Sequence, residues 1–256
     1  MFAACPVALP RQPHDPAWVS PFEQDLIVLV GVTGAGKSTL LKALEASVRT
    51  FRLLPERREL TDALIIGPME PGDTLDRAER FRRTAAFQQS HPGGMAEALS
   101  GTRVEPDPQP VVFDGLRGEH EVRFAAGFPR VRFVELTAPD EERVRRLLGR
   151  ADRFDGLPSA GGDLDPASAR SRLAEVEGAT EVFTPAQLDR LAALTASGFP
   201  AAEIAAKAAI VVAERRNYDP AAASAVLAAL PPERVLRLDT GVLGAAEVGK
   251  AALEWL

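Results

Sequence analysis

The 256-residue sequence contains a single cysteine, Cys5, which excludes an internal disulfide and is typical of a protein in a reducing compartment. It also lacks any apolar run near the roughly 20 residues that a membrane-spanning helix requires. The opening residues 1–5 have neither the basic start nor the long apolar stretch of a secretory signal. We therefore expect a cytoplasmic protein with no membrane contact.

An excess of basic residues is also missing. The chain has 30 Lys and Arg against 36 Asp and Glu, a formal net charge of −6. This balance argues against broad, non-specific binding to nucleic acid, although a local basic groove would still allow it. With 46% hydrophobic and 26% charged residues, the chain can bury a core of ordinary size. Its length fits one large α/β domain, or one domain with an appendage.

Short apolar runs alternate with helical patterns along most of the chain. The first run, residues 26–30, is apolar throughout, as in a strand buried on both faces of a parallel sheet. Four later runs have a similar character: 51–54, 110–114, 131–136 and 235–238. Helical patterns between them, including 38–49 and 245–256, imply crossover connections. Because residues 31–38, directly after the first run, have the spacing of a phosphate-binding loop, the sequence predicts an α/β fold of the P-loop type, with a mostly parallel five-stranded sheet and helices on both faces.

Three stretches fall outside this alternation. Residues 1–22 hold five prolines, whose fixed φ angles and missing N–H groups suit an extended lead-in. We expect residues 23–256 to form one domain with two insertions. The first, 55–109, is expected to bind an acceptor and contains a helical pattern over 73–90. The second, 151–232, is expected to form a lid or helical insert.

The second insertion begins with residues 154–168, which are rich in Gly, Pro, Ser and Asp and are expected to form a mobile loop. Three helical patterns follow it. The first opens at Thr184-Pro185, a capping residue followed by proline at the first helical position, and closes near Gly198. The others run over 200–216 and 220–230.

Residues 31–38, Gly-Val-Thr-Gly-Ala-Gly-Lys-Ser, match the complete spacing of a phosphate-binding loop. Its glycines let backbone N–H groups converge on a phosphate, and the following helix adds the positive end of its dipole. Lys37 can reach the β- and γ-phosphates, and the Ser38 hydroxyl can bind Mg²⁺. We therefore expect ATP and Mg²⁺ as ligands. The predicted nucleotide-binding residues are Gly34, Ala35, Gly36, Lys37, Ser38 and Thr39.

Asp114 follows the apolar run 111–113 and is the candidate for the second Mg²⁺ ligand, binding the metal directly or through water. An Asp-Gly pair after a strand can instead simply start a turn. Because a phosphate-binding loop requires an acidic partner on a neighbouring strand, we interpret Asp114 as that partner.

Three segments resemble kinases of small molecules. Residues 114–117, Asp-Gly-Leu-Arg, resemble a segment of nucleoside-monophosphate kinases, which implies that Arg117 contacts a substrate phosphate. Residues 134–150 resemble the strand-to-lid segment of adenylate kinases and dephospho-coenzyme-A kinases. That resemblance implies that Arg146 and Arg150 lie near the adenine and the transferring phosphates. Residues 238–241, Leu-Asp-Thr-Gly, resemble the loop that borders the base in such kinases.

The arginines of the helical pattern that starts near Pro139 also suggest a role by their spacing. Arg143, Arg146 and Arg150 lie within about 60° of one another on a helical wheel. Such a stripe beside a phosphate site can neutralise charge on a transferring phosphoryl group. The alternative is a solvated face in which Glu142 pairs with Arg146. For Arg143 this alternative is at least as good.

The first insertion offers weaker candidates. Arg82 lies at the margin of the apolar side of the 73–90 pattern, where it either extends to solvent or points into a cleft, and it is included as a candidate substrate contact. The charged cluster 56–59 is expected to be a solvated face. Asp62 is either a general base for a substrate hydroxyl or a cap.

These features predict an ATP-dependent kinase that transfers the γ-phosphoryl group to a nucleotide or other small-molecule acceptor. Its predicted catalytic residues are Lys37, Asp114, Arg146 and Arg150. A P-loop ATPase that acts as a switch with a protein partner is one alternative. The other is a kinase of nucleic-acid ends, whose basic groove would be formed by Arg52, Arg57, Arg58, Arg77, Arg80 and Arg83. The sequence has neither the base-reading motif of GTPases nor the signature of transporter ATPases, which disfavours both classes.

Overall fold

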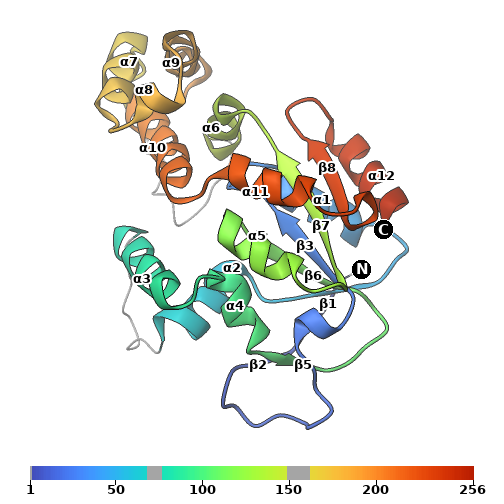
Figure 1. Cartoon of the computed structure of the whole chain (residues 1–256). Helices are drawn as coiled ribbons and strands as arrows, with labels where there is room; N and C mark the ends of the chain where they lie inside the picture. Colours follow the sequence, from blue (N-terminus) through green and yellow to red (C-terminus); the bar gives the residue numbers. More distant parts are fainter. Residues whose placement is uncertain (1, 68–76, 149–161) are drawn as a thin grey trace.

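The computed structural model describes residues 2–67, 77–148 and 162–256. Within these residues, six strands form one sheet in which every neighbouring pair is parallel (Figure 1). In spatial order the strands are β1 (Phe2–Ala4), β4 (Phe51–Leu53), β6 (Val111–Leu116), β3 (Leu26–Val30), β7 (Val131–Thr137) and β8 (Val235–Asp239). The prediction of a mostly parallel α/β sheet is confirmed.

The sheet has one strand more than the five predicted, because the beginning of the chain adds β1 at an edge. Residues 2–4 pair with residues 51–53, and the rings of Phe2 and Phe51 lie 6.0 Å apart. The prolines of the lead-in start only at Pro6, so the residues before it keep the N–H groups that a strand needs. Further along, β2 (Val7–Ala8) pairs antiparallel with β5 (Arg103–Val104).

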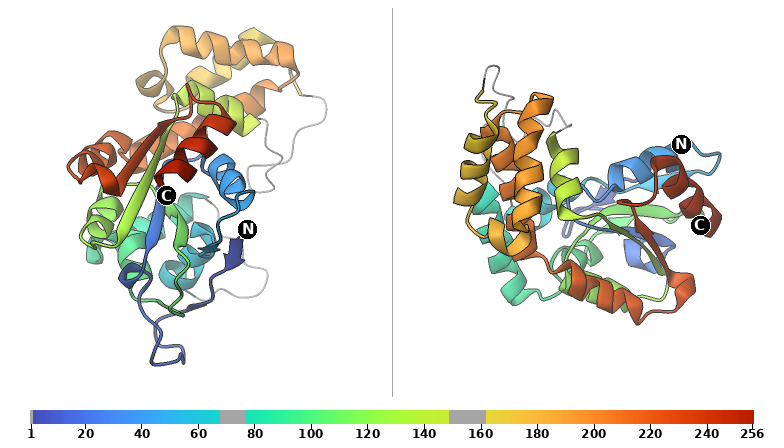
Figure 2. Two further views of the ribbon diagram at one scale, coloured as in Figure 1. Left: turned by 90° about the vertical axis from the view of Figure 1, so that its right-hand side faces the viewer. Right: turned by 90° about the horizontal axis from the view of Figure 1, so that it is seen from above.

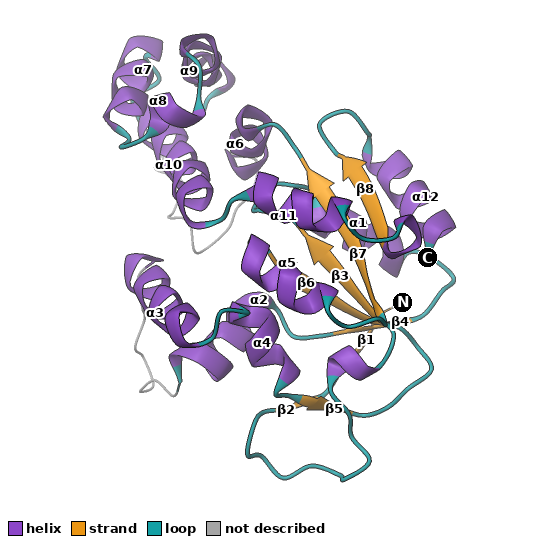
Figure 3. Cartoon of the chain, in the orientation of Figure 1, coloured by secondary structure: helices purple, strands orange, loops and turns teal. Residues whose placement is uncertain are grey.

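The central strand shows how the sheet is covered on both faces. Alternate residues of β3 belong to two hydrophobic clusters: Leu26, Val28 and Val30 to one, and Ile27 and Leu29 to the other. Figure 3 shows the helices around the sheet. The helices of the first cluster include α4 (Gly94–Ser100), α5 (Glu119–Ala126) and α11 (Pro220–Ala228), and those of the second include α1 (Lys37–Glu45) and α12 (Ala245–Trp255).

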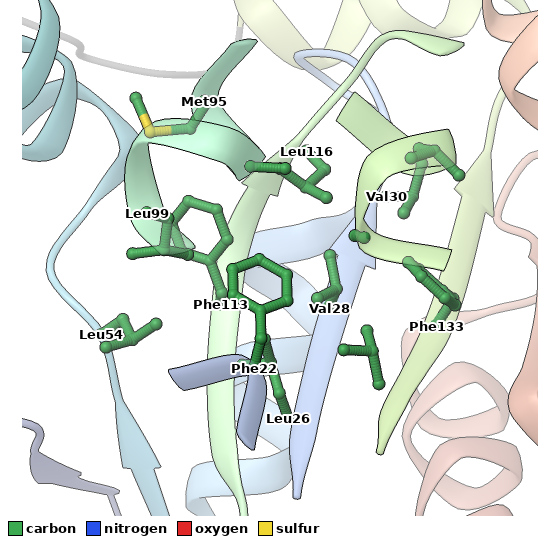
Figure 4. Packing of buried hydrophobic residues seen from close by; sticks show 14 of the residues in the cluster. Phe22, Leu26, Val28, Val30, Leu54, Met95, Leu99, Phe113, Leu116 and Phe133 are labelled. Carbon is green, nitrogen blue, oxygen red and sulfur yellow. The ribbon is translucent and has the colours of Figure 1, made fainter. Parts of the chain in front are cut away.

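The first cluster joins the sheet to the first insertion, residues 55–109, which we call the acceptor segment after its expected role. Phe113 of β6 and Met95 and Leu99 of α4 are fully or almost fully buried in it (Figure 4). The rest of the segment contains α2 (Arg57–Thr61), a one-turn π-helix (Asp62–Ile66) and α3 (Arg77–Ser90). The helix predicted over 73–90 is therefore present from Arg77, and its first four residues lie outside the described part.

The helical insert has a hydrophobic core of its own and stands beside the sheet (Figure 2). It follows α6 (Asp140–Leu148), which contributes Val144 and Leu147 to that core. Its helices are α7 (Pro166–Glu175), α8 (Ala179–Val182), α9 (Pro185–Ala192), a 3-10 helix (Ala193–Ser197) and α10 (Ala201–Asn217). Thr184 caps α9 as predicted, together with Gln187.

The loop predicted over 154–168 ends earlier than expected. Its residues 154–161 lie outside the described part, but α7 already begins at Pro166, where the Asp165 side chain accepts a hydrogen bond from the Ser168 N–H. The Asp-Pro pair is thus a helix cap followed by proline at the first helical position, rather than part of a loop. No helix within the described ranges is long and apolar enough to cross a membrane.

Candidate nucleotide-binding site

The phosphate-binding loop leaves the centre of the sheet. It connects β3 to α1, and β3 lies between β6 and β7. Because these strands are parallel, their carboxyl ends meet at one edge, where open α/β sheets bind ligands. The sheet order therefore brings Asp114 of β6 beside the loop, as the sequence predicted.

Successive carbonyl groups of the loop are each bonded to a side chain. Lys37 Nζ donates to the carbonyl oxygens of residues 31 and 32 at 2.8 and 3.3 Å. Arg143 Nε bonds the residue 33 carbonyl at 2.8 Å, and Arg146 Nη1 bonds the residue 34 carbonyl at 3.1 Å. The Thr240 hydroxyl donates to the residue 35 carbonyl at 3.0 Å. Five successive carbonyls are thus fixed in position.

Fixing the carbonyls also fixes the N–H groups of the loop. In a trans peptide the C=O and the following N–H point in opposite directions, so the bonds that hold the residue 33 and 35 carbonyls also set the directions of the Gly34 and Gly36 N–H groups. Among the described residues, the N–H groups of Gly34, Gly36 and Ser38 donate to no other group. They are therefore available to an anion at the positive end of α1.

Two glycines are required by the shape of the loop. Gly34 and Gly36 have φ angles of +85° and +99°, in the left-handed region that favours glycine. A Cβ on Gly34 would lie 3.1 Å from the backbone of Arg143, and one on Gly36 would lie 2.9 Å from the Thr240 side chain. The same side chains that hold the loop therefore leave no room for larger residues.

Asp114 sits in a β-bulge rather than at the start of a turn. Val28 pairs with Phe113 and Val30 with Leu116, so that two residues of β6 face a single residue of β3. Bulges of this kind re-aim a side chain and are common beside active sites. The alternative in which Asp114-Gly115 merely starts a turn does not apply, since the strand continues to Leu116.

The carboxylate of Asp114 fits a magnesium ligand. Its Oδ1 is buried without a hydrogen-bond partner among the described residues, 3.7 Å from Lys37 Nζ. Mg²⁺ takes oxygen ligands and is usually held by one or two protein groups together with phosphates and water. Asp114 and Ser38 line the same cavity, and their oxygen atoms are such a donor set.

Two cavities adjoin different residues of the loop. One, of about 370 Å³, is lined by Gly36, Thr39, Arg146 and Thr240, and it lies beside the loop predicted to border the base. We call it the base-side cavity. The other, of about 410 Å³, is lined by the P-loop and by the first residues of the acceptor segment. We call it the acceptor-side cavity, and its polar lining includes Lys37, Ser38, Arg57, Arg58, Asp114 and Arg117.

Arg143 and Arg146 of α6 contact carbonyl groups of the loop. Arg143 is only 1% exposed, so the solvated alternative is wrong for this residue, and its ion pair with Asp140 is 2.6 Å long. Arg146 pairs with Glu142 at 3.0 Å as expected, and it also donates to the Thr240 carbonyl at 2.6 Å. Its role toward the transferring phosphoryl group stays a prediction. Arg150 lies outside the described residues.

A second expectation, about the acceptor segment, is wrong. The cluster 56–59 is not uniformly solvated, because Arg57 forms a bidentate ion pair with Glu121 at 2.8 and 2.6 Å. It also donates to the carbonyl of Gly115. Burial opposes ionisation of Glu121, but Arg57 outweighs it and lowers the pKa of this carboxyl. The side chain of Arg57 thus joins α2 to the bulge beside Asp114.

Two other candidates are placed differently from the cavities. Arg82 is 69% exposed and pairs with Glu79, and it is not among the residues that line either cavity, so its substrate role stays a prediction. Asp62 forms a bidentate ion pair with Arg80, with its second bond at 3.0 Å. A carboxylate held in this way is a weak general base, because the arginine stabilises its charged form.

Sequence reasoning missed Glu214 of α10. This fully buried carboxylate accepts hydrogen bonds from the Thr33 N–H at 3.0 Å, from the Thr33 hydroxyl, from Arg117 at 2.8 Å and from Arg143 at 2.6 Å. The signal was present, since Ile204, Ala208 and Val211 mark the buried face of α10 and residue 214 continues that spacing. A glutamate on the apolar face of a helix requires partners.

Together, the parallel sheet, the loop with its carbonyls bonded to side chains and the bulged aspartate define a P-loop nucleotide-binding protein with an α/β fold. The family model described as an AAA domain matches residues 27–156, just over half of the chain. The chain belongs to this family. The matched range runs from β3 through β7 and α6, and so contains the loop, Asp114, Arg143 and Arg146.

The solved structures similar to this chain include a sugar kinase from Janibacter sp. HTCC2649, at 15% identity over 91% of this chain and 94% of the other, with a TM-score of 0.37. Another is TT1252 from Thermus thermophilus, at 18% identity over 90% and 95%, with a TM-score of 0.40. A third is a gluconokinase from Sinorhizobium meliloti 1021, at 16% identity over 91% of each chain, with a TM-score of 0.37.

These TM-scores are low, and the fold assignment stands on the sheet order and the loop of this chain itself. No curated protein matches the chain. The narrower resemblance to nucleoside-monophosphate kinases and dephospho-coenzyme-A kinases stays a prediction.

Proposed function

We propose that this chain is an ATP-dependent kinase that transfers the γ-phosphoryl group to a small-molecule acceptor. The observation that carries the proposal is the acceptor-side cavity of about 410 Å³, which adjoins Lys37, Ser38 and Asp114. An acceptor bound there would lie directly against the end of a triphosphate held by the loop. The separate base-side cavity leaves room for the nucleoside beside other residues of the same loop.

Each group at the loop would have a distinct task. The N–H groups of residues 34, 36 and 38 would bind phosphate oxygens, and Lys37 would neutralise the phosphates. Ser38 and Asp114 would hold Mg²⁺, which supplies positive charge to the phosphates when it is bound. Arg146 would border the base and keep the loop in shape, since it contacts both Gly34 and Thr240.

On the acceptor side, Arg117 is the main candidate for contact with the acceptor. It follows the Asp114 bulge, lines the cavity, and stands next to the ring of Tyr218 at 5.8 Å. Its position is fixed by two carboxylates, since its N–H donates to Glu121 and its guanidinium to Glu214. An arginine held in this way is ready to bind an oxygen-rich acceptor without being reordered.

The hydrogen bonds between Glu214 and the loop also fit an alternative function, that of a switch ATPase. A switch ATPase needs a mechanical link between its nucleotide loop and another part of the molecule, and α10 supplies one. The two functions differ in what limits ATP turnover. A kinase consumes ATP rapidly only when an acceptor is present, whereas a switch ATPase hydrolyses it without one.

The test is an ADP-release assay on the purified protein with ATP and Mg²⁺, with and without a panel of small hydroxylated and phosphorylated acceptors. We expect at least one acceptor to raise ADP release, with mass spectrometry showing one phosphoryl group gained per ADP formed. The Lys37→Ala variant should abolish this gain. Lys42→Ala is the matched control, because Lys42 lies on the same helix and is exposed. Acceptor-independent turnover alone would contradict the proposal.

A further inference from the structure

The carboxylate of Glu214 joins four parts of the molecule that are distant in the sequence. Its Oε1 binds the Thr33 hydroxyl and Arg117, and its Oε2 binds the Thr33 N–H and Arg143. Each oxygen atom therefore contacts one group of the phosphate-binding loop and one arginine. The loop, the segment after β6, helix α6 and the helical insert all meet at this residue.

The contacts form a closed ring around one peptide of the loop. Glu214 holds the Thr33 N–H, Arg143 holds the Thr33 carbonyl at 2.8 Å, and Glu214 holds Arg143. The Thr33 carbonyl and the Gly34 N–H belong to the same trans peptide and point in opposite directions. Any movement of Arg143 would therefore change the direction of the Gly34 N–H, which is one of the donors available to an anion.

A charged group at this buried position is energetically unfavourable by itself. Glu214 is fully buried, and burial of a carboxylate costs several kcal/mol unless its partners compensate. Burial raises the pKa of this carboxyl, but Arg117, the Thr33 hydrogen bond and Arg143 outweigh burial, so that the net pKa is lowered and the charged form persists. An apolar side chain would pack against the core of the insert without this cost, which suggests that the charge has a task beyond packing.

The residues after Glu214 extend the same link. Arg215 pairs with Asp140 at 2.7 Å, and Asp140 also binds Arg143. The ring of Tyr218 lies 5.8 Å from the guanidinium groups of both Arg57 and Arg117. The last turn of α10 thus docks the insert on both the loop and the acceptor-side cavity. The position of the insert and the shape of the loop are set by the same few contacts.

We propose that Glu214 is a positioning residue for phosphoryl transfer. Through Thr33 and Arg143 it orients the Gly34 N–H toward the bound phosphates. Through Arg117 it couples this orientation to the position of the helical insert. The effect on turnover rests on the proposed kinase function. The effect on nucleotide binding rests only on the phosphate-binding loop.

The first test compares Glu214→Gln with Glu203→Gln, which changes a glutamate in the first turn of the same helix, at the end opposite to Glu214. Glutamine keeps the shape and one hydrogen bond to Thr33 but loses the charge that holds both arginines. We expect Glu214→Gln to weaken ADP and ATP binding, measured by calorimetry, by on the order of 10-fold or more. The value of kcat should fall further than KM rises. Glu203→Gln should match the unaltered protein.

A second variant separates positioning from stability. Leu191→Ala opens a cavity in the core of the insert without touching Glu214, and removal of a buried leucine lowers stability substantially. If Leu191→Ala lowers the melting temperature as much as Glu214→Gln but leaves nucleotide affinity and kcat unchanged, the carboxylate has the proposed role. If both variants lose affinity and kcat in proportion to stability, Glu214 is structural and the proposal is wrong.

The third test does not depend on any catalytic activity. Thr33→Val removes only the hydroxyl contact, so the double variant with Glu214→Gln should bind ADP no more weakly than Glu214→Gln alone. Hydrogen exchange should show that ADP and Mg²⁺ protect residues 201–217 in the unaltered protein but not in Glu214→Gln. Additive losses in affinity, or equal protection in both proteins, would overturn the proposal even if no acceptor is ever found.

Discussion

The two sides of the phosphate-binding loop are built in different ways. The nucleotide side consists mostly of backbone groups from one stretch of eight residues, and its spacing is visible in the sequence. The acceptor side consists of side chains from residues 57, 114 and 117, held in place by Glu121 and Glu214 from two further elements. A local motif can specify a phosphate cradle, whereas an acceptor site depends on contacts that only the fold creates.

The largest expected effect is a loss of stability on the acceptor side with little change in nucleotide affinity. Glu121→Gln leaves the buried guanidinium of Arg57 without its charged partner, and breaking such a pair costs about 3–5 kcal/mol of unfolding free energy. Denaturant unfolding should show this loss, whereas ADP affinity of the folded variant should stay within about 2-fold, well under the tenfold that 1.4 kcal/mol represents. Glu119→Gln is the control, since its pair with Arg123 is exposed and contributes at most about 1 kcal/mol. Equal losses in the two variants would contradict the comparison.

The next largest expected effect is a loss of nucleotide affinity. Lys37→Ala removes a charge-assisted contact that contributes about 1.5–3 kcal/mol, so ATP affinity measured by calorimetry should fall on the order of 10- to 100-fold. The fold should remain intact by circular dichroism. Binding of the acceptor without nucleotide should fall less than ATP binding, because Lys37 is one of several polar residues that line the acceptor-side cavity. Unaltered ATP affinity in a folded variant would remove the basis for a nucleotide site.

Asp114 tests the boundary between the two sides. Asp114→Asn weakens a magnesium ligand, so turnover should fall most at limiting Mg²⁺ and recover in part as the metal concentration rises. Asp25→Asn, at the opposite end of the sheet, is the control, because its pair with Arg130 is exposed. A lower melting temperature with a normal dependence on Mg²⁺ would show that Asp114 has only a structural role.

A smaller effect should appear with pH and should be shared by both sides. The pKa values of Glu121 and Glu214 are lowered in the folded protein from an ordinary value of 4.5. The stability that these carboxylates contribute is therefore fully present above about 4.5 and is lost as pH falls through their lower folded values. Thermal melting across this range should show a steeper loss for the unaltered protein than for Glu121→Gln. Parallel curves would contradict the assignment.

The sequence was sufficient for the core of the fold because its strands are short apolar runs with clear boundaries. Residues 26–30, for example, can only be buried on both faces, and they are. The edge strand at residues 2–4 was missed because nearby prolines dominated the interpretation of the lead-in. The Asp165-Pro166 cap is similarly hidden in the sequence, because the Gly, Pro, Ser and Asp residues before it are typical of a loop.

The acceptor side was harder because its signals are shared with ordinary surface charge. Arg57 belongs to a charged cluster that looks solvated, and only the position of Glu121, 64 residues away, shows that it is not. Arg143 was equally ambiguous until the structure placed it against Thr33 and Glu214. Burial and pairing of charges depend on tertiary contacts, which residue spacing does not specify.

The bonded carbonyls of the phosphate-binding loop have a consequence for the entropy of binding. Fixing the backbone of one residue costs about 1–2 kcal/mol in conformational entropy, and a flexible loop would incur that cost for several residues when the phosphates arrive. Here Lys37, Arg143, Arg146 and Thr240 hold five successive carbonyls through bonds within the protein itself. Most of this conformational entropy is therefore lost during folding and not on binding. The free energy of the nucleotide contacts then contributes almost fully to affinity.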